Sequence, residues 1–273
     1  HPDPTVKRQS GFLRPQLNNS KTLGTSFYLP YYHVISDNKD YTFKPQIFDS
    51  DIQMYQNEYR QVNKHSTFIA DFGITTGYQS SLTGSNRNSI GHLFSNFDID
   101  LNLKGFSNSE LNFYLESVTN DTFLKVFQNN LIKSSLKPSS TSSLNSGFKL
   151  MLDNEDHNFD TGMRVYETLS GAESDRYQYE FPYYSYSTTL LNELADGTFN
   201  FSSSGSNVLN NTNVLKTSIN NDLSYASLDY FSNIGFKNNY GMHFKNLNTV
   251  AKNHDVYKSS FQSQLMSIFE AKS

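Results

Sequence analysis

Side chains that could hold a metal ion are scattered along this sequence of 273 residues. The polar turn 153–156, Asp-Asn-Glu-Asp, lacks the glycine and glutamate positions of a calcium-binding helix–loop–helix motif. Four of the seven histidines show no ligand spacing: His65, His92, His157 and His254. We therefore expect no metal site and no cofactor.

Carboxylates stand two residues apart at Asp98/Asp100 and at Asp153/Glu155, which places each pair on one face of a strand. Such pairs can line a polar lumen or bind calcium weakly, and a solvated strand face is the alternative. The sequence contains no Gly-x-Ser-x-Gly motif, no phosphate-binding loop and no dinucleotide fingerprint. We therefore expect a protein that is not an enzyme.

Two prolines, Pro15 and Pro30, fall inside the first two predicted strands. Proline cannot donate a hydrogen bond to the ladder, so it is tolerated at sheet edges, strand starts or bulges. Each proline therefore predicts a weak place in strand pairing. The plainer alternative is that each marks a bulge or a strand end and has no further role.

The elements that carry these residues follow from hydrophobic residues at alternate positions. In the segment 97–104, Phe-Asp-Ile-Asp-Leu-Asn-Leu-Lys, every odd position is apolar and every even one is charged or an amide. Period-two alternation places successive side chains on opposite faces of a strand. Similar alternation occurs near residues 43–47, 111–116, 148–153 and 176–181. We also favour a strand over a helix for 261–272, and we find little convincing helix elsewhere.

Dividing the chain at clusters of Asn, Asp, Gly and Ser predicts a series of strands, several of them long enough to cross a bilayer. The predicted strands are 10–17, 25–35, 41–48, 52–62, 66–74, 89–104, 109–127, 146–153, 158–168, 176–190, 198–206, 214–225, 231–246 and 256–271. The predicted fold class is all-β: an antiparallel up-and-down transmembrane β-barrel, present here as an incomplete, open and curved sheet of about 12–14 strands.

The connections are of two kinds. Tight ones are predicted at 36–40, 63–65, 105–108 and 154–157, and longer ones at 75–88, 128–145 and 207–213. Outer-membrane barrels combine short periplasmic turns with longer external loops. The connection 49–51 is short where a long one is expected. The serine-rich piece 134–146 is expected to form a flexible external loop.

Composition excludes several other classes. Aromatic residues make up 15% of the chain and charged residues 18%, and the formal net charge is −4 without long charged runs. A nucleic-acid partner is therefore not expected, because it would need a basic stripe. Cysteine is absent, which rules out disulfides and thiolate sites. No secretory signal and no apolar run long enough for a membrane helix occur.

Four short motifs occur in order along the first sixty residues. They are Ser10-Gly11-Phe12-Leu13-Arg14-Pro15, Leu29-Pro30-Tyr31-Tyr32, Thr42-Phe43-Lys44-Pro45 and Glu58-Tyr59-Arg60. Their order and spacing resemble the opening strands of the barrel in the LptD family of lipopolysaccharide-assembly proteins. The segments 175–177 and 181–184 also look like family segments. One departure is His33, where the family commonly has tryptophan.

The resemblance implies an outer-membrane translocon that inserts lipopolysaccharide into the outer leaflet through a lateral gate near the first strands, with Pro15 and Pro30 weakening that gate. It implies an LptE-like lipoprotein plug, a periplasmic Lpt bridge reached through a separate N-terminal domain, and contact with outer-membrane lipids. Residues 1–273 would be the N-terminal part of the barrel domain only, without the periplasmic jelly-roll and the later strands. Location in the cell outer membrane follows.

The alternative is an extracellular all-β adhesin or another structural binding protein. A sandwich buries its apolar face between two sheets, whereas a barrel wall exposes that face to lipid. The two hypotheses therefore differ in one structural observation. If the apolar rows pack against a second layer of the same molecule, the barrel hypothesis is wrong.

Overall fold

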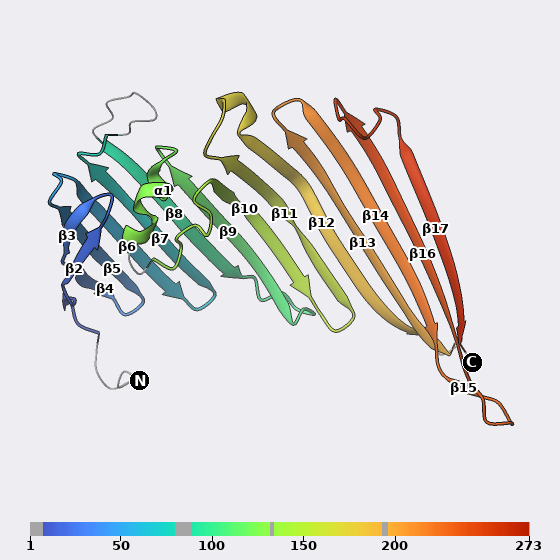
Figure 1. The fold of residues 1–273 in the computed structure, drawn as a ribbon. Helices are drawn as coiled ribbons and strands as arrows, with labels where there is room; N and C mark the ends of the chain where they lie inside the picture. Colours follow the sequence, from blue (N-terminus) through green and yellow to red (C-terminus); the bar gives the residue numbers. More distant parts are fainter. Residues whose placement is uncertain (1–7, 80–88, 132–133, 193–195, 273) are drawn as a thin grey trace. The chain divides into compact units, whose positions relative to one another are not determined.

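The computed structural model describes residues 8–79, 89–131, 134–192 and 196–272, and β-strands dominate it. The strands belong to one large antiparallel sheet of 17 strands that is not closed into a barrel (Figure 1). The all-β prediction is confirmed, while the predicted count of 12–14 strands was too low. Among the described residues, no helix is both long and apolar enough to cross a membrane.

Each of the fourteen predicted strand segments corresponds to one or two observed strands. The three additional strands arise because the first two segments are each split and because a short strand, β15, precedes β16. The strands are β1 Gly11–Phe12, β2 Gln16–Ser20, β3 Gly24–Tyr28, β4 Tyr31–Ser36, β5 Lys39–Phe48, β6 Gln53–Asn63, β7 Ser66–Thr76, β8 Ser89–Asp100, β9 Asn108–Val118, β10 Ser143–Asp153, β11 His157–Thr168, β12 Tyr177–Asn192, β13 Gly197–Asn210, β14 Val214–Ser227, β15 Tyr230–Phe231, β16 Lys237–Lys252 and β17 Gln262–Lys272.

Consecutive strands pair through hairpins, most of them over long registers. Strands β5 to β8 pair in chain order, and β9 pairs with β10. Farther along, β12, β13, β14, β16 and β17 pair one after another. The strand predicted over 261–272 is confirmed as β17.

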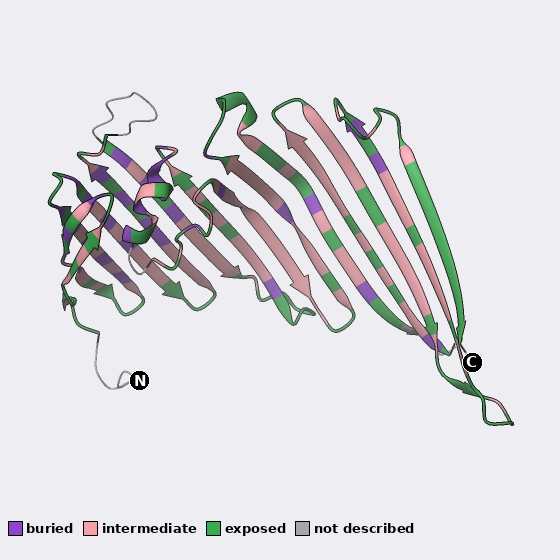
Figure 2. Ribbon diagram, in the orientation of Figure 1, coloured by how far each residue is buried: buried purple, intermediate pink, exposed green. Residues whose placement is uncertain are grey.

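The chain divides into two compact units, which are described separately below. The first comprises residues 1–99, 112–146 and 167–171, and the second comprises 100–111, 147–166 and 172–273. Fully buried positions of the first unit lie on β5 to β8 and on the small helix α1, Phe123–Phe127 (Figure 2). In the second unit, most positions along the strands are only half-buried.

Helix α1 was not predicted, because the sequence favoured a strand over 109–127. Strand β9 ends at Val118, and the chain then forms α1 and a 3-10 turn at Gln128–Asn130. Phe123, Leu124 and Phe127 of the helix are fully buried in a cluster with residues of β5, β6, β8 and β10. Contacts with residues far away in sequence thus stabilise this helix, and the alternation of residues along the chain does not reveal those contacts.

Three smaller predictions also need correction. Strand β8 ends at Asp100, before the predicted limit of 104, and the connection predicted at 207–213 is only the turn 211–213. The serine-rich piece 134–146 is not a free loop, because Pro138 is buried and Leu136 packs against the buried cluster. Of the predicted loop 75–88, residues 80–88 lie outside the described part of the chain.

Candidate functional site: a proline-interrupted edge and a polar sheet face

Pro15 and Pro30 interrupt the first two strand segments at the same level. Pro15 lies between β1 and β2, and Pro30 lies between β3 and β4. Pairing holds at Phe12 opposite Tyr31 and resumes at Gln16 opposite Tyr28. Residues 13–15 thus face residues 29–30, and the extra residue on one side forms a bulge. The prediction that both prolines lie inside strands was wrong, since each lies in a break.

The backbone hydrogen bonds at this break are only half made. The N–H of Leu13 donates to the Pro30 carbonyl at 2.8 Å, and the N–H of Leu29 donates to the Pro45 carbonyl at 3.3 Å. In an antiparallel ladder, opposed residues of this kind exchange two bonds. Neither return bond can form here, because Pro30 and Pro45 have no N–H.

Three prolines of neighbouring chain segments therefore lie near one level of the sheet. Pro45 lies within β5, where it stays in register with Tyr55 of β6. The predicted site residues Pro15, Pro30 and Pro45 are thus brought together, although the sequence analysis assigned only the first two to a weak place. We name this group the proline gap. Each absent bond weakens pairing by about 0.5–1.5 kcal/mol.

The remaining motif residues of the first strands surround the proline gap. The rings of Phe12 and Tyr31 meet edge to face with centroids 5.1 Å apart. The guanidinium of Arg8 lies 5.8 Å from the centre of the Tyr32 ring. Gly11 pairs with Tyr32 across the same strands, and Leu13 is exposed. This edge of the sheet is therefore held by two short strands with aromatic contacts between them.

One face of β5 to β8 buries charged and amide side chains, and we call it the polar face. Lys44 Nζ lies 2.6 Å from Glu58 Oε2, with both side chains buried. Asp71, which is 0% exposed, accepts a hydrogen bond from the Gln56 amide at 2.7 Å and bonds His92 Nε2 at 3.0 Å. The polar residues of this face are Asp40, Thr42, Lys44, Gln46, Gln56, Glu58, Asp71 and His92, and Phe48, Met54, Ile90 and Phe94 of the buried apolar cluster lie on the same face.

Arginine side chains extend the polar face toward the tight turns. Arg60 Nε lies 2.8 Å from one oxygen of Asp40, and Arg8 contacts the other oxygen. Of the predicted motif, Glu58 and Arg60 therefore lie together on the polar face. Tyr59 lies on the opposite face, where its ring is 6.0 Å from that of Phe68.

The opposite face of the same strands exposes large apolar side chains, and we call it the apolar face. On β5, Ile47 is 51% exposed, while its neighbours Gln46 and Phe48 are buried on the other side. Ile74 on β7 is 57% exposed. The exposed large residues of this face on β5, β7, β8 and β9 are Ile47, Phe72, Ile74, Leu93, Phe113 and Leu115. A soluble sheet normally shows the reverse arrangement.

The second unit also pairs opposite charges across its strands. Lys149 pairs with Asp160 at 2.6 Å, and Lys245 pairs with Asp222 at 3.1 Å. Arg164 lies 3.9 Å from the centre of the Tyr183 ring. The predicted family segment at 181–184 contains a register shift between Glu180 and Tyr183, so a proline again marks a bulge.

A ladder of amide and hydroxyl groups crosses the second unit. Ser203 donates to Asn221 at 2.8 Å, and Asn221 donates to Asn246 at 3.4 Å. Asn246 then donates to Ser263 Oγ and to the Gln264 carbonyl, each at 3.2 Å. These side chains satisfy one another, so the ladder joins β13, β14, β16 and β17 without requiring water.

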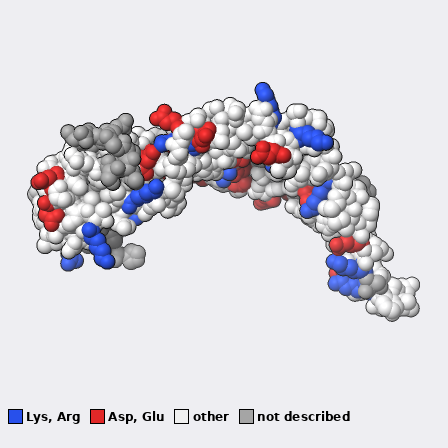
Figure 3. All heavy atoms as spheres, turned by 45° about the horizontal axis from the view of Figure 1, so that its top comes forward, with Lys and Arg blue, Asp and Glu red and all other residues white. Residues whose placement is uncertain are grey.

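Metal-ligating side chains do not gather in the part of the chain that the structure describes, where no group of three or more His, Asp or Glu could hold a metal ion. Figure 3 shows charges of both signs in small groups separated by uncharged surface on the face in view. Asp98, one of the paired carboxylates, accepts a hydrogen bond from Asn96 at 2.5 Å.

The sequence analysis did not identify Gln56, Asp71 and His92 as a group. Each of them occupies an alternate position of its strand, and the register of the strands places them side by side.

In comparison with known proteins, no protein-family model matches the chain and no curated protein matches it.

Proposed function

We propose that this chain is part of the wall of a bacterial outer-membrane β-barrel, an LptD-like translocon that inserts lipopolysaccharide into the outer leaflet. One observation carries the membrane part of the proposal. Large apolar side chains such as Ile47 and Ile74 are exposed on one face, whereas charged and amide side chains such as Asp71 are buried on the other. Lipid favours the first face, and an aqueous lumen favours the second.

The translocon part of the proposal rests on the four motifs and on the proline gap. Two half-made backbone pairs weaken the ladder where the first strands meet β5. Parting of the strands at such a place would let acyl chains pass sideways while the polar face accommodates sugars. An LptE-like plug and a periplasmic Lpt bridge would be its partners. No covalent step is required.

The membrane part is tested by flotation. The full chain, refolded with phospholipid vesicles, should float with them in a density gradient and should be released only by detergent. Aggregated protein would sediment, so flotation separates insertion from precipitation. Soluble, folded protein that leaves the vesicles behind would support an extracellular adhesin and overturn the proposal.

The gate is tested in the full-length translocon with Pro15→Ala and Pro30→Ala together. The backbone N–H that the second substitution restores can return a hydrogen bond to the Leu13 carbonyl, so we expect a tighter seam and slower appearance of lipopolysaccharide at the cell surface. Arg14→Ala, an exposed change in the same break, should leave export unchanged. Normal export in the double variant would remove the gating role.

A further inference from the structure

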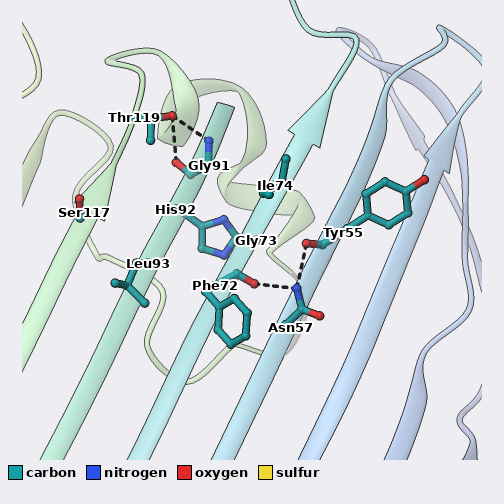
Figure 4. Close-up of a pocket in the computed structure, with 10 residues that line it drawn as sticks. All are labelled: Tyr55, Asn57, Phe72, Gly73, Ile74, Gly91, His92, Leu93, Ser117 and Thr119. Atoms are coloured by element: carbon teal, nitrogen blue, oxygen red, sulfur yellow. Dashed lines mark hydrogen bonds between the residues drawn. The ribbon is translucent and has the colours of Figure 1, made fainter. Parts of the chain in front are cut away.

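A depression of about 500 Å³ lies in the apolar face of the first unit, over β6 to β9. Figure 4 shows its walls, formed by Phe72, Ile74 and Leu93, with Tyr55 at one side. Gly91 of β8 pairs with Ile74 of β7. Because glycine has no side chain, it leaves a space in the row of side chains that β8 presents on this face. This volume falls within the range of small-molecule sites in proteins, about 300–1,000 Å³.

Glycine at the floor of the depression allows β7 and β8 to approach closely. A Cβ on Gly91 would lie 3.0 Å from the Gly73 carbonyl oxygen. The missing side chain at Gly91 therefore leaves the hollow open in the row of side chains on β8.

Two of the polar side chains that line the depression, Asn57 and Thr119, already have partners. Asn57 donates to the carbonyls of Tyr55 and Phe72, each at 3.3 Å, and its amide oxygen accepts from Tyr41 (Figure 4). The Thr119 hydroxyl accepts from the N–H of Gly91 at 2.8 Å. A polar ligand would have to displace these bonds, whereas an apolar ligand needs only the exposed Phe72, Ile74 and Leu93 surfaces.

We propose that this depression binds one acyl chain of a bilayer phospholipid. The inference rests on the proposed function, since it takes the apolar face to be the lipid-facing one. The depression is continuous with that face and crosses four strands, which at about 4.8 Å per strand spacing gives about 14 Å of apolar surface. An acyl chain lying across the strands would fill it and keep its headgroup outside.

The chain contains no tryptophan, so a single one is an unambiguous reporter. Tyr55→Trp places it in the depression, and Phe113→Trp places it on the apolar face outside. Phosphatidylcholine with brominated acyl chains quenches tryptophan that it touches. In detergent micelles with equimolar brominated lipid, we expect saturable quenching of the tryptophan at position 55 and none at 113.

Ser117→Phe should fill the depression and abolish the quenching in micelles at position 55. Ser267→Phe, at an exposed serine of β17, is the matched control and should leave the quenching intact. In bilayers of brominated lipid, quenching at position 113 tests the lipid-facing wall by itself. Absence of that bilayer quenching would overturn the proposed function. Bilayer quenching at 113 without saturable micelle quenching at 55 would overturn the acyl-chain site alone.

Discussion

Lys44 and Glu58 form an ion pair across β5 and β6, and their side chains are only 4% and 9% exposed. A buried pair of this kind contributes little net stability, but loss of one partner leaves an uncompensated charge. We therefore expect Glu58→Leu to lower the free energy of unfolding by about 3–5 kcal/mol. Urea titration of the full chain in phospholipid vesicles measures this change.

The control for that measurement is the double variant Lys44→Met with Glu58→Leu, which removes both charges and keeps similar volumes. Replacement of a whole buried pair by apolar residues is often neutral or stabilising. The double variant should therefore recover most of the stability lost in the single one. If both variants are equally unstable, the volume of the side chains matters here and their charge does not.

For single residues, the sequence predicted the site residues that alternation within one strand reveals and missed those that depend on pairing between strands. The alternation of Lys44 and Gln46 with Phe43 and Ile47 is visible along one strand, and the structure places the two pairs on opposite faces, with Lys44 and Gln46 buried and Ile47 exposed. Contact between Asp71 and His92 depends on the register of β7 with β8, which no single strand encodes. Registers follow from turns and long-range packing.

At the scale of single elements, helix α1 anchors the connection between β9 and β10. The Phe123 ring stacks 5.1 Å from the His92 ring, and it is fully buried. Truncation of a buried aromatic side chain costs about 3–5 kcal/mol. We expect Phe123→Ala to detach the segment from the polar face, so that trypsin cleaves after Lys125 faster than in the unchanged protein.

Asn129→Ala is the matched control, because Asn129 follows the helix and is exposed. Its cleavage rate should equal that of the unchanged protein. Equal rates for Phe123→Ala and Asn129→Ala would mean that the remaining contacts, such as the Tyr78 ring 5.3 Å from the Phe127 ring, hold the segment by themselves.

Among the elements, long strands were predictable and their interruptions were not. Alternation located β5, β6 and β7 to within about three residues, because a strand between two different environments needs that pattern throughout. The proline gap was predicted only in part. Pro15 and Pro30 signalled weak pairing, but convergence with Pro45 depends on the pairing of β4 with β5.

For the molecule as a whole, the informative feature is whether each face of the sheet carries charged or apolar side chains. Both units carry cross-strand ion pairs, Lys44–Glu58 in the first and Lys245–Asp222 in the second, together with exposed apolar side chains. This repetition along the chain is what a wall between lipid and water needs, whereas a local binding patch would show it once. Under the proposed function, the exposed apolar residues of both units would face lipid.

The proposed wall predicts different costs for the same charge in different places. Phe113 lies in the middle of β9, and Phe231 lies in the β15 hairpin beyond the long strands. An arginine at the bilayer midplane costs about 2–4 kcal/mol, whereas one in water changes stability by about 0.5 kcal/mol at most. We expect Phe113→Arg to destabilise the chain in vesicles by the larger amount and Phe231→Arg by the smaller. Phe113→Leu corrects for loss of the ring contact with Phe97, whose centroid is 6.5 Å away. If arginine at 113 is tolerated as well as leucine, the apolar face meets water and the wall hypothesis is wrong.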